Sequence, residues 1–124
     1  MPSYLIEASY SAEGLKGLMQ DKAAGREDAV STAVAGLGGK LESLYYCFGE
    51  FDVVFIADLP DDRAAFALVH TISASGLVRT RTTPLLTIQD TDLALEKTVE
   101  YREPGQYLTC PGFRPPDTNG RPAL

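Results

Sequence analysis

Apolar and polar residues alternate in several stretches of the chain, and this period of two is typical of half-buried strands. Residues 3–9 show it first, and residues 40–48, 51–59 and 77–89 are rich in aromatic and β-branched residues. Pro84 falls within the last stretch, so we expect it at a sheet edge or at a bulge. The pattern therefore predicts four strands.

Helical spacing separates these strands. Ser11 is suited to cap a short helix at residues 12–20. A clearer helix precedes residue 39, with its apolar positions at Val30, Ala33, Val34 and Leu37. Another covers about residues 61–75, with Ala65, Leu68, Val69 and Ile72. Both sets follow the i, i+3, i+4, i+7 pattern that gives a helix one buried face.

The resulting order β-α-β-β-α-β favours a ferredoxin-like α+β sandwich, in which helices cover one face of a four-stranded antiparallel sheet. The opposite face must then meet water or a partner, and these strands are too apolar for water. We therefore expect a homodimer, or a higher even-numbered homo-oligomer, with sheets packed face to face as in a dimeric α+β barrel.

Residues 1–90 form the predicted domain, and residues 91–124 form a C-terminal extension with one more helix within 90–101. The proline-rich arm that follows contains five of the eight prolines, so it cannot remain regular for long. We expect this arm to pack on its own or a neighbouring subunit through Tyr107, Phe113 and Leu124. A free tail is the alternative.

Charge and composition restrict the partners. The 124 residues carry a net charge of −6, which argues against nucleic acid and against an anionic membrane surface. No apolar run approaches the roughly 20 residues of a membrane span. The two cysteines, Cys47 and Cys110, are too few for a disulfide framework, which favours a reduced, cytoplasmic protein.

A two-residue type II′ turn at Gly49–Glu50 is predicted to join the second and third strands. Side chains alternate between the two faces of a strand. One face then carries Leu44, Tyr46, Phe48, Phe51, Val53 and Phe55, which we assign to the core beneath the helices. The other carries Leu41, Ser43, Tyr45, Cys47, Asp52, Val54, Ile56 and Asp58, a mixed surface typical of a subunit interface with a small pocket.

Asp52 is the best candidate catalytic residue, as a general base whose pKa is raised in a dry interface. The alternative is structural, with the carboxylate accepting hydrogen bonds near the turn or pairing with Arg79 or Arg81. Tyr45 either binds a ligand or fills the interface. Cys47 is either a reactive thiolate or, as we favour, a small buried hydrophobe.

The last strand alternates arginine with threonine. Arg79 and Arg81 either hold an acidic ligand or protect an edge strand from aggregation. Thr80 and Thr82 are ordinary strand formers that join the candidate ligand-binding set. His70 is the single histidine, and without ligand partners at suitable spacing it predicts no metal site. We also expect no cofactor.

The stretches GGKLESLYYCFGEFDVVFIADLPDD (38–62) and GLVRTRT (76–82) resemble the GYD domain family, over roughly residues 3 to 90. The matching positions are Gly39, Tyr45, Gly49, Glu50, Asp52, Pro60, Arg79, Thr80 and Thr82. Phe51 replaces the usual tyrosine of the motif. The resemblance implies roles for Gly49 and Asp52 and a fold similar to dimeric α+β barrel proteins.

Three functions remain open at this point. The first is an oligomeric module that binds a small organic ligand at the sheet or subunit interface. The second is a cofactor-free enzyme, similar to an isomerase or monooxygenase, acting on a small organic acid or aromatic metabolite. The third is an accessory subunit that docks into a larger complex through its C-terminal arm.

Overall fold

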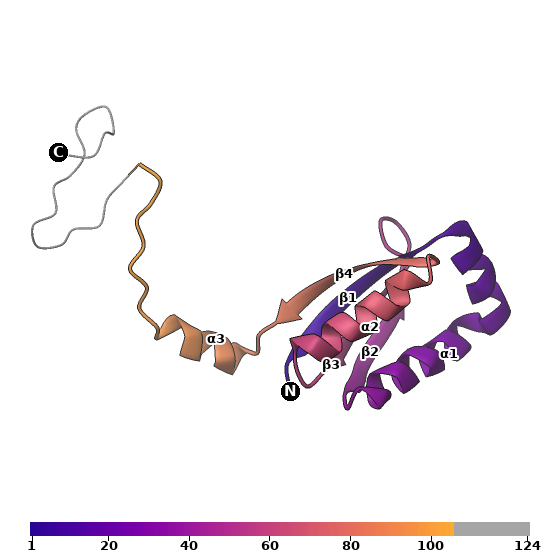
Figure 1. Cartoon of the computed structure of the whole chain (residues 1–124), viewed down its shortest axis with the longest axis horizontal. Coiled ribbons are helices and arrows are strands. Elements are labelled where there is room, and N and C mark those ends of the chain that lie inside the picture. The colour runs from indigo at the N-terminus through magenta and orange to yellow at the C-terminus, as the bar shows by residue number, and fades with distance from the viewer. Residues whose placement is uncertain (106–124) are drawn as a thin grey trace, which may run out of the picture. The chain divides into compact units, whose positions relative to one another are not determined.

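The computed structural model describes residues 1–105 (Figure 1). Its elements are β1 (Ser3–Tyr10), α1 (Ala12–Gly36), β2 (Lys40–Tyr46), β3 (Val53–Asp58), α2 (Asp62–Ala74), β4 (Val78–Leu85) and α3 (Ile88–Leu95). The chain divides into a unit covering Met1–Thr87 and a second unit that begins at Ile88. The expected arm contacts of Tyr107, Phe113 and Leu124 lie outside the described residues.

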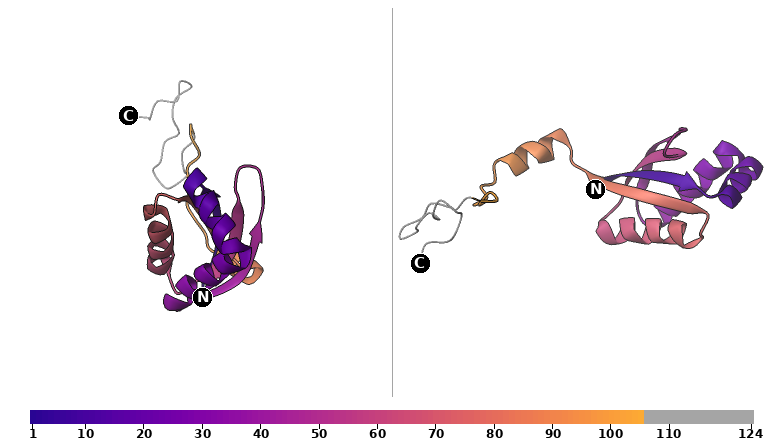
Figure 2. Two further views of the ribbon diagram at one scale, coloured as in Figure 1. Left: turned by 90° about the vertical axis from the view of Figure 1, so that its right-hand side faces the viewer. Right: turned by 90° about the horizontal axis from the view of Figure 1, so that it is seen from above.

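The sheet of the first unit has the strand order β2-β3-β1-β4, and every neighbouring pair is antiparallel. Helix α1 packs over β2, and α2 packs over β4 (Figure 1, Figure 2). The predicted ferredoxin-like topology is therefore confirmed. Pro84 lies on β4, an edge strand as expected, where its missing N–H breaks no pairing within the sheet.

Alternate positions of β1 and β3 provide most of the core. The buried hydrophobic residues are Tyr4, Ile6, Ala8, Val34, Val53, Phe55, Ala57, Leu59, Ala65 and Leu68. The predicted helix faces are largely confirmed, because Val30, Leu37, Val69 and Ile72 pack against this core. Ala33 is the exception: it is exposed rather than buried, and it borders a cavity described below.

The two helices predicted between residues 12 and 37 are confirmed: they share the label α1 and are separated by the non-helical backbone of Lys22. The backbone of Lys22 adopts φ 66° and ψ 167°, a conformation that residues other than glycine rarely take. The hydroxyl of Ser11 accepts a hydrogen bond from the Gly14 N–H at 3.1 Å, as expected of a helix cap. The helix resumes after the break and leads directly to Arg26.

The β2–β3 connection partly follows the predicted register. Tyr45 lies opposite Val54 and Tyr46 opposite Val53, as expected. The strands end there, however, so the loop is longer than a two-residue turn, and Gly49 has φ 129° instead of the roughly 60° of a type II′ turn. Phe48 is consequently 99% exposed and does not belong to the core as predicted.

A second correction concerns Leu41, which was placed on the face away from the helices. A β-bulge between Leu41 and Ser43 inserts Glu42 and pairs Leu41 with Ala57. Leu41 and Leu44 both pack against the core. Because these leucines are three positions apart, regular alternation would place them on opposite faces, and the bulge puts both on the apolar side.

The sheet face away from α1 and α2 is called the open face here. It consists of Ser3, Leu5, Glu7, Ser9, Ser43, Tyr45, Val54, Ile56, Asp58, Arg79, Arg81, Thr83 and Leu85. Most of the apolar members are half-buried, whereas Tyr45, Arg79 and Arg81 are exposed. Arg81 pairs with Glu7 across the two neighbouring strands at 3.7 Å.

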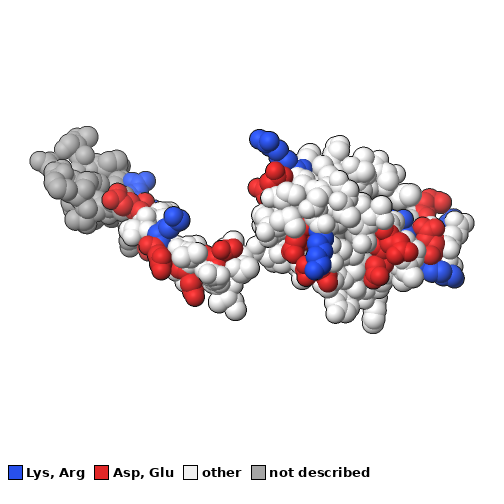
Figure 3. Space-filling model, turned by 90° about the horizontal axis from the view of Figure 1, so that it is seen from below, with Lys and Arg blue, Asp and Glu red and all other residues white. Residues whose placement is uncertain are grey.

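The helices and the surface charge of residues 1–105 bear on possible partners. None of the helices in this range is both long and apolar enough to cross a bilayer. On the side shown in Figure 3, acidic groups are spread among uncharged areas, and the described residues form no continuous basic area there. This distribution agrees with the net charge of −6.

Candidate functional site

The helix side of the sheet contains a cavity between the strands and the two helices α1 and α2, and we call it the helix-side pocket. It has a volume of about 110 Å³. Its lining residues are Ala8, Tyr10, Arg26, Ala29, Val30, Ala33, Leu44, Tyr46, Val53, Phe55, Ile72, Val78 and Thr80. Apolar walls with a few polar groups are typical of small-molecule sites.

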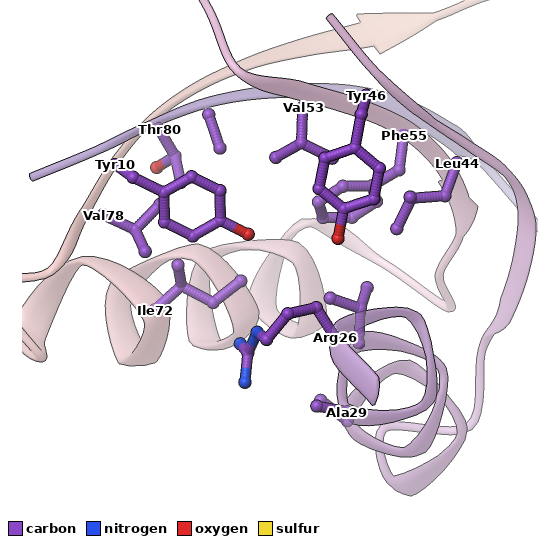
Figure 4. Close-up of a pocket in the computed structure, with 13 residues that line it drawn as sticks. Tyr10, Arg26, Ala29, Leu44, Tyr46, Val53, Phe55, Ile72, Val78 and Thr80 are labelled. Atoms are coloured by element: carbon purple, nitrogen blue, oxygen red, sulfur yellow. The ribbon is translucent and has the colours of Figure 1, made fainter. Parts of the chain in front are cut away.

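The polar groups of this pocket come from four different elements. Tyr10 ends β1, Tyr46 ends β2, Arg26 lies on α1 and Thr80 on β4. Figure 4 shows the two phenol rings on the sheet side, with Arg26 extending from the helix toward the space below their hydroxyls. The Thr80 hydroxyl is already hydrogen-bonded to Ser73 of α2, with 3.2 Å between the two oxygens.

Tyr46 is the unusual member of the set. Its hydroxyl oxygen is buried, and within residues 1–105 it has no hydrogen-bond partner. Burial raises the pKa of Tyr46 to about 12, and the charge of Arg26 opposes the increase. The Tyr10 phenol lies close enough to interact with the Tyr46 hydroxyl and adds to the increase, but the two groups do not meet the distance and angle of a hydrogen bond. The hydroxyl therefore remains protonated at neutral pH and can donate a hydrogen bond into the pocket.

Arg26 provides the positive charge. Its Nη1 lies 3.5 Å from Oδ2 of Asp21, and both side chains are partly exposed to solvent. Such an exposed pair contributes little stability, at most about 1 kcal/mol. A guanidinium has five N–H donors, so this contact leaves others for a ligand.

The helix-side pocket adjoins a second cavity of about 320 Å³ beneath the first half of α1. Tyr10, Arg26, Ile72 and Val78 line both cavities. Asp21 lines only the second one. A molecule in the helix-side pocket can thus extend past Arg26 toward a more polar space.

The predicted ligand-binding residues do not form a single site. Tyr45 and Cys47 are exposed on and after β2, and Tyr45 is 69% exposed. Arg79 lies on the open face of β4, whereas Thr80 and Thr82 point to the helix side. Two strands separate Tyr45 from Arg79, which corresponds to roughly 14 Å at the usual strand spacing.

Asp52 lies between the hairpin and β1. Its Oδ2 accepts a hydrogen bond from the Tyr10 backbone N–H at 2.8 Å, and its own N–H donates to the Ala8 carbonyl at 2.8 Å. The carboxylate does not line the helix-side pocket. These contacts correspond to the structural alternative for Asp52, in which it accepts a hydrogen bond near the turn.

Cys47 is exposed, so the buried position favoured from the sequence is wrong. Its thiol lies 3.1 Å from the Phe51 carbonyl oxygen, a local contact within the hairpin loop. The loop leaves the sheet here, which explains why the strand alternation did not predict this exposure.

A shallow cleft beside the hairpin brings two of the predicted residues together. Arg79 and Thr80 line it with Ser9, Glu50, Phe51 and Arg81, and its volume is about 320 Å³. The Arg81 guanidinium lies 5.7 Å from the centre of the Phe51 ring, within cation–π range. Phe51 was assigned from the sequence to the core beneath the helices, and this is wrong: its ring packs against Arg81, which belongs to the open face.

Sequence reasoning missed Tyr10 and Arg26 and placed Tyr46 only in the core. One signal was present, because Tyr46 is a residue whose polar tip needs a hydrogen-bond partner when buried. No sequence pattern predicted the break at Lys22 that precedes Arg26. Tyr10, Arg26 and Tyr46 come together only because α1 packs where it does on the sheet. The spacing of residues in the sequence does not predict that position.

The topology and the pocket define a ferredoxin-like α+β domain with a small apolar cavity between sheet and helices. The pattern of the GYD domain matches residues 4–95, which is most of the chain. The chain belongs to the GYD domain family. Among curated proteins, no sequence matches this chain.

Two solved structures are similar in fold. TTHA0845 from Thermus thermophilus is 20% identical, with a TM-score of 0.45 over 70% of this chain and 95% of that chain. The leucine response regulatory protein LrpA of Mycobacterium tuberculosis is 21% identical, with a TM-score of 0.43 over 69% of this chain. The match spans 51% of the length of the LrpA chain.

Proposed function

We propose that this GYD domain is an oligomeric module that binds a small organic molecule in the helix-side pocket. The observation that supports the proposal is the buried Tyr46 hydroxyl, which makes no hydrogen bond of good geometry within residues 1–105, although the Tyr10 phenol interacts with it. Leaving such a group unpaired costs about 1–3 kcal/mol. A bound molecule with an acceptor atom would remove this cost, so ligand binding would gain free energy from a hydrogen bond to Tyr46.

The walls favour an apolar body for that ligand. Val53 and Phe55 of β3 form the floor on the sheet side, and Ile72 of α2 lies opposite. A cavity of about 110 Å³ is somewhat smaller than the roughly 150 Å³ engineered cavity that binds benzene. A single ring or a short branched chain is the appropriate size, with further atoms reaching into the adjoining cavity.

Binding is better supported than catalysis. The described residues that line the helix-side pocket include no aspartate, glutamate, histidine or cysteine. The raised pKa of Tyr46 makes its hydroxyl a hydrogen-bond donor and a poor base at neutral pH. The pocket therefore offers recognition groups without a general base.

The oligomer in this proposal is formed by a second copy at the open face. Leu5, Val54 and Ile56 lie side by side on the central strands of this face and are half-buried within one chain. Neither α1 nor α2 covers them. A second sheet packed on this face would remove their remaining apolar surface from water, at about 25 cal/mol per Å².

An NMR titration with benzyl alcohol tests the pocket without assuming a charged ligand. The expected result is saturable shifts of the Ile72 and Val53 methyl resonances. The variant Ala33→Leu should weaken these shifts, because Ala33 borders the pocket and a larger side chain would fill it. Ala67→Leu is the control, since Ala67 is an exposed α2 residue that does not line the pocket.

Two outcomes would contradict the proposal. Shifts that map to the open face, or that fail to saturate, would place the interaction elsewhere. Equal binding by the Ala33→Leu and Ala67→Leu variants would show that the helix-side pocket is not the site.

A further inference from the structure

We propose that the helix-side pocket selects a small monocarboxylate, whose carboxylate lies between the Tyr46 hydroxyl and the Arg26 guanidinium. This inference rests on the proposed binding function and adds the chemical class of the ligand. The ligand body would be a single aromatic ring or a branched alkyl group against Val53, Phe55 and Ile72.

The first argument is the type of hydrogen-bonding group that the pocket presents. Arg26 can only donate hydrogen bonds. The Tyr46 hydroxyl is protonated at neutral pH, and within residues 1–105 it makes no hydrogen bond of good geometry, the Tyr10 phenol being a polar group that interacts with it from nearby. The ligand must therefore provide acceptor oxygens, and a carboxylate has two oxygens and no donor when ionised.

The second argument is charge. Arg26 is the single ionised side chain among the described residues that line the pocket, although the carboxylate of Glu27, outside the lining, also acts on the Tyr46 hydroxyl. Its partner Asp21 lies outside this lining, and the 3.5 Å contact between them is partly exposed. A positively charged ligand group would be repelled by Arg26, whereas a carboxylate would form a charge-assisted hydrogen bond with it.

The third argument is the arrangement of the donors in space. Tyr10 and Tyr46 come from β1 and β2, which lie on either side of β3, and Arg26 approaches from α1 (Figure 4). The two phenols thus lie on the sheet side and Arg26 on the helix side, while Val53, Phe55 and Leu44 add apolar surface on the sheet side. This polarity fits a molecule with one anionic end and one apolar end.

Three probes of the same shape test the inference by isothermal titration calorimetry with the full chain: benzoate, benzamide and benzamidinium. They carry a negative, a neutral and a positive group on one ring. Benzoate should bind at least tenfold more tightly than benzamide, and benzamidinium should bind most weakly. The probes need not resemble the natural ligand beyond their size and charge.

Variants locate the selectivity. Arg26→Met keeps the side-chain length and removes the charge, so the preference for benzoate over benzamide should fall by about tenfold while benzamide affinity changes little. Arg63→Met is the matched control, because Arg63 is an exposed α2 residue outside the pocket. If Arg26→Met fails to fold, Arg26→Gln and the comparison of the three probes on the unmodified protein still test the preference for a carboxylate.

The outcomes separate the two proposals. Equal affinity for benzoate and benzamide in the unmodified protein would overturn the carboxylate inference while leaving the binding pocket intact. A preference that persists in a folded Arg26→Met protein would also overturn it. If no probe bound and benzyl alcohol also failed to bind, the proposed function itself would be wrong.

Discussion

The backbone N–H of Tyr10 donates a hydrogen bond to Oδ2 of Asp52, with 2.8 Å between nitrogen and oxygen. This contact joins the hairpin loop to the last residue of β1. The phenol of the same Tyr10 lines the helix-side pocket. Asp52 thus holds the backbone of a residue whose side chain lines the pocket.

The variants Asp52→Ala and Asp52→Asn should differ in stability. Alanine removes the acceptor for the Tyr10 N–H and should lower the free energy of unfolding by about 1–2 kcal/mol. Asparagine retains an acceptor oxygen, so its loss should be smaller, below about 1 kcal/mol. Urea denaturation measures both values. An alanine variant as stable as the unmodified protein would show that this hydrogen bond has no structural role.

The buried phenols of Tyr46 and Tyr4 should respond in opposite directions to replacement by phenylalanine. Tyr46→Phe removes an unpaired buried hydroxyl, so without ligand the protein should be as stable as before or up to about 1 kcal/mol more stable. Tyr4→Phe removes a 2.6 Å hydrogen bond to Asp62 and should cost about 1.5–3 kcal/mol.

Thermal and urea unfolding without added ligand measure both changes. A Tyr46→Phe variant that loses as much stability as Tyr4→Phe would indicate that the Tyr46 hydroxyl is hydrogen-bonded after all. That result would remove the main support for a binding pocket.

Alkaline pH should destabilise the fold through the same two phenols. The pKa of Tyr4 is raised to about 12, chiefly by its hydrogen bond to Asp62, and that of Tyr46 to about 12, chiefly by burial, from an ordinary value of 10.0. The unfolded chain therefore loses these protons first. Stability should be complete below pH 10 and fall between about pH 10 and 12.

Near-ultraviolet absorbance can follow the ionisation of the tyrosines in the folded protein. Two of them should ionise late, and each single phenylalanine variant should remove one of the late steps. Ionisation of Tyr46 near pH 10 in folded protein would contradict its burial.

Gly39, which directly precedes β2, should not tolerate a side chain. A Cβ atom there would lie 2.3 Å from the Asp58 carbonyl oxygen, a backbone atom that cannot easily move. Gly39→Ala should cost about 1–3 kcal/mol. Gly36→Ala is the control, since nothing lies within 4 Å of its Cβ position, and it should be neutral or slightly stabilising in α1. Equal stability of the two variants, measured by urea denaturation, would be inconsistent with this packing.

Ile56 on the open face should control assembly. Ile56→Asp would place a charge in the proposed sheet-to-sheet contact and should give monomers or insoluble protein. Ala67→Asp, on the exposed side of α2, should retain the oligomer of the unmodified chain. Sedimentation velocity measures the oligomeric state. An unmodified chain that sediments as a monomer at micromolar concentration would overturn the oligomer proposal.

Local periodicity was sufficient to predict the topology. Alternation in β1 and β3, and the helical spacing around Val34 and Leu68, follow directly from burial on one side of each element. The register of Tyr45 and Tyr46 was also predictable, because both strands must place their apolar residues on shared faces.

The errors arise where the chain departs from regular pairing. The bulge at Glu42 changes the face of Leu41, and the longer loop exposes Phe48. The residues at the bulge and in the longer loop are still of the types expected for strands and a short turn, so the sequence pattern could not reveal either of these departures. The helix-side pocket was missed because it depends on the separation between α1 and the sheet, which no single segment encodes.

A crystal structure of the full chain grown with a mixture of benzoate, benzamide and benzyl alcohol tests the central claim most directly. The account predicts electron density for one of these molecules in the helix-side pocket, with an acceptor oxygen within hydrogen-bond distance of the Tyr46 hydroxyl. A pocket filled by protein side chains, with the Tyr46 hydroxyl bonded to another residue of the chain, would contradict it.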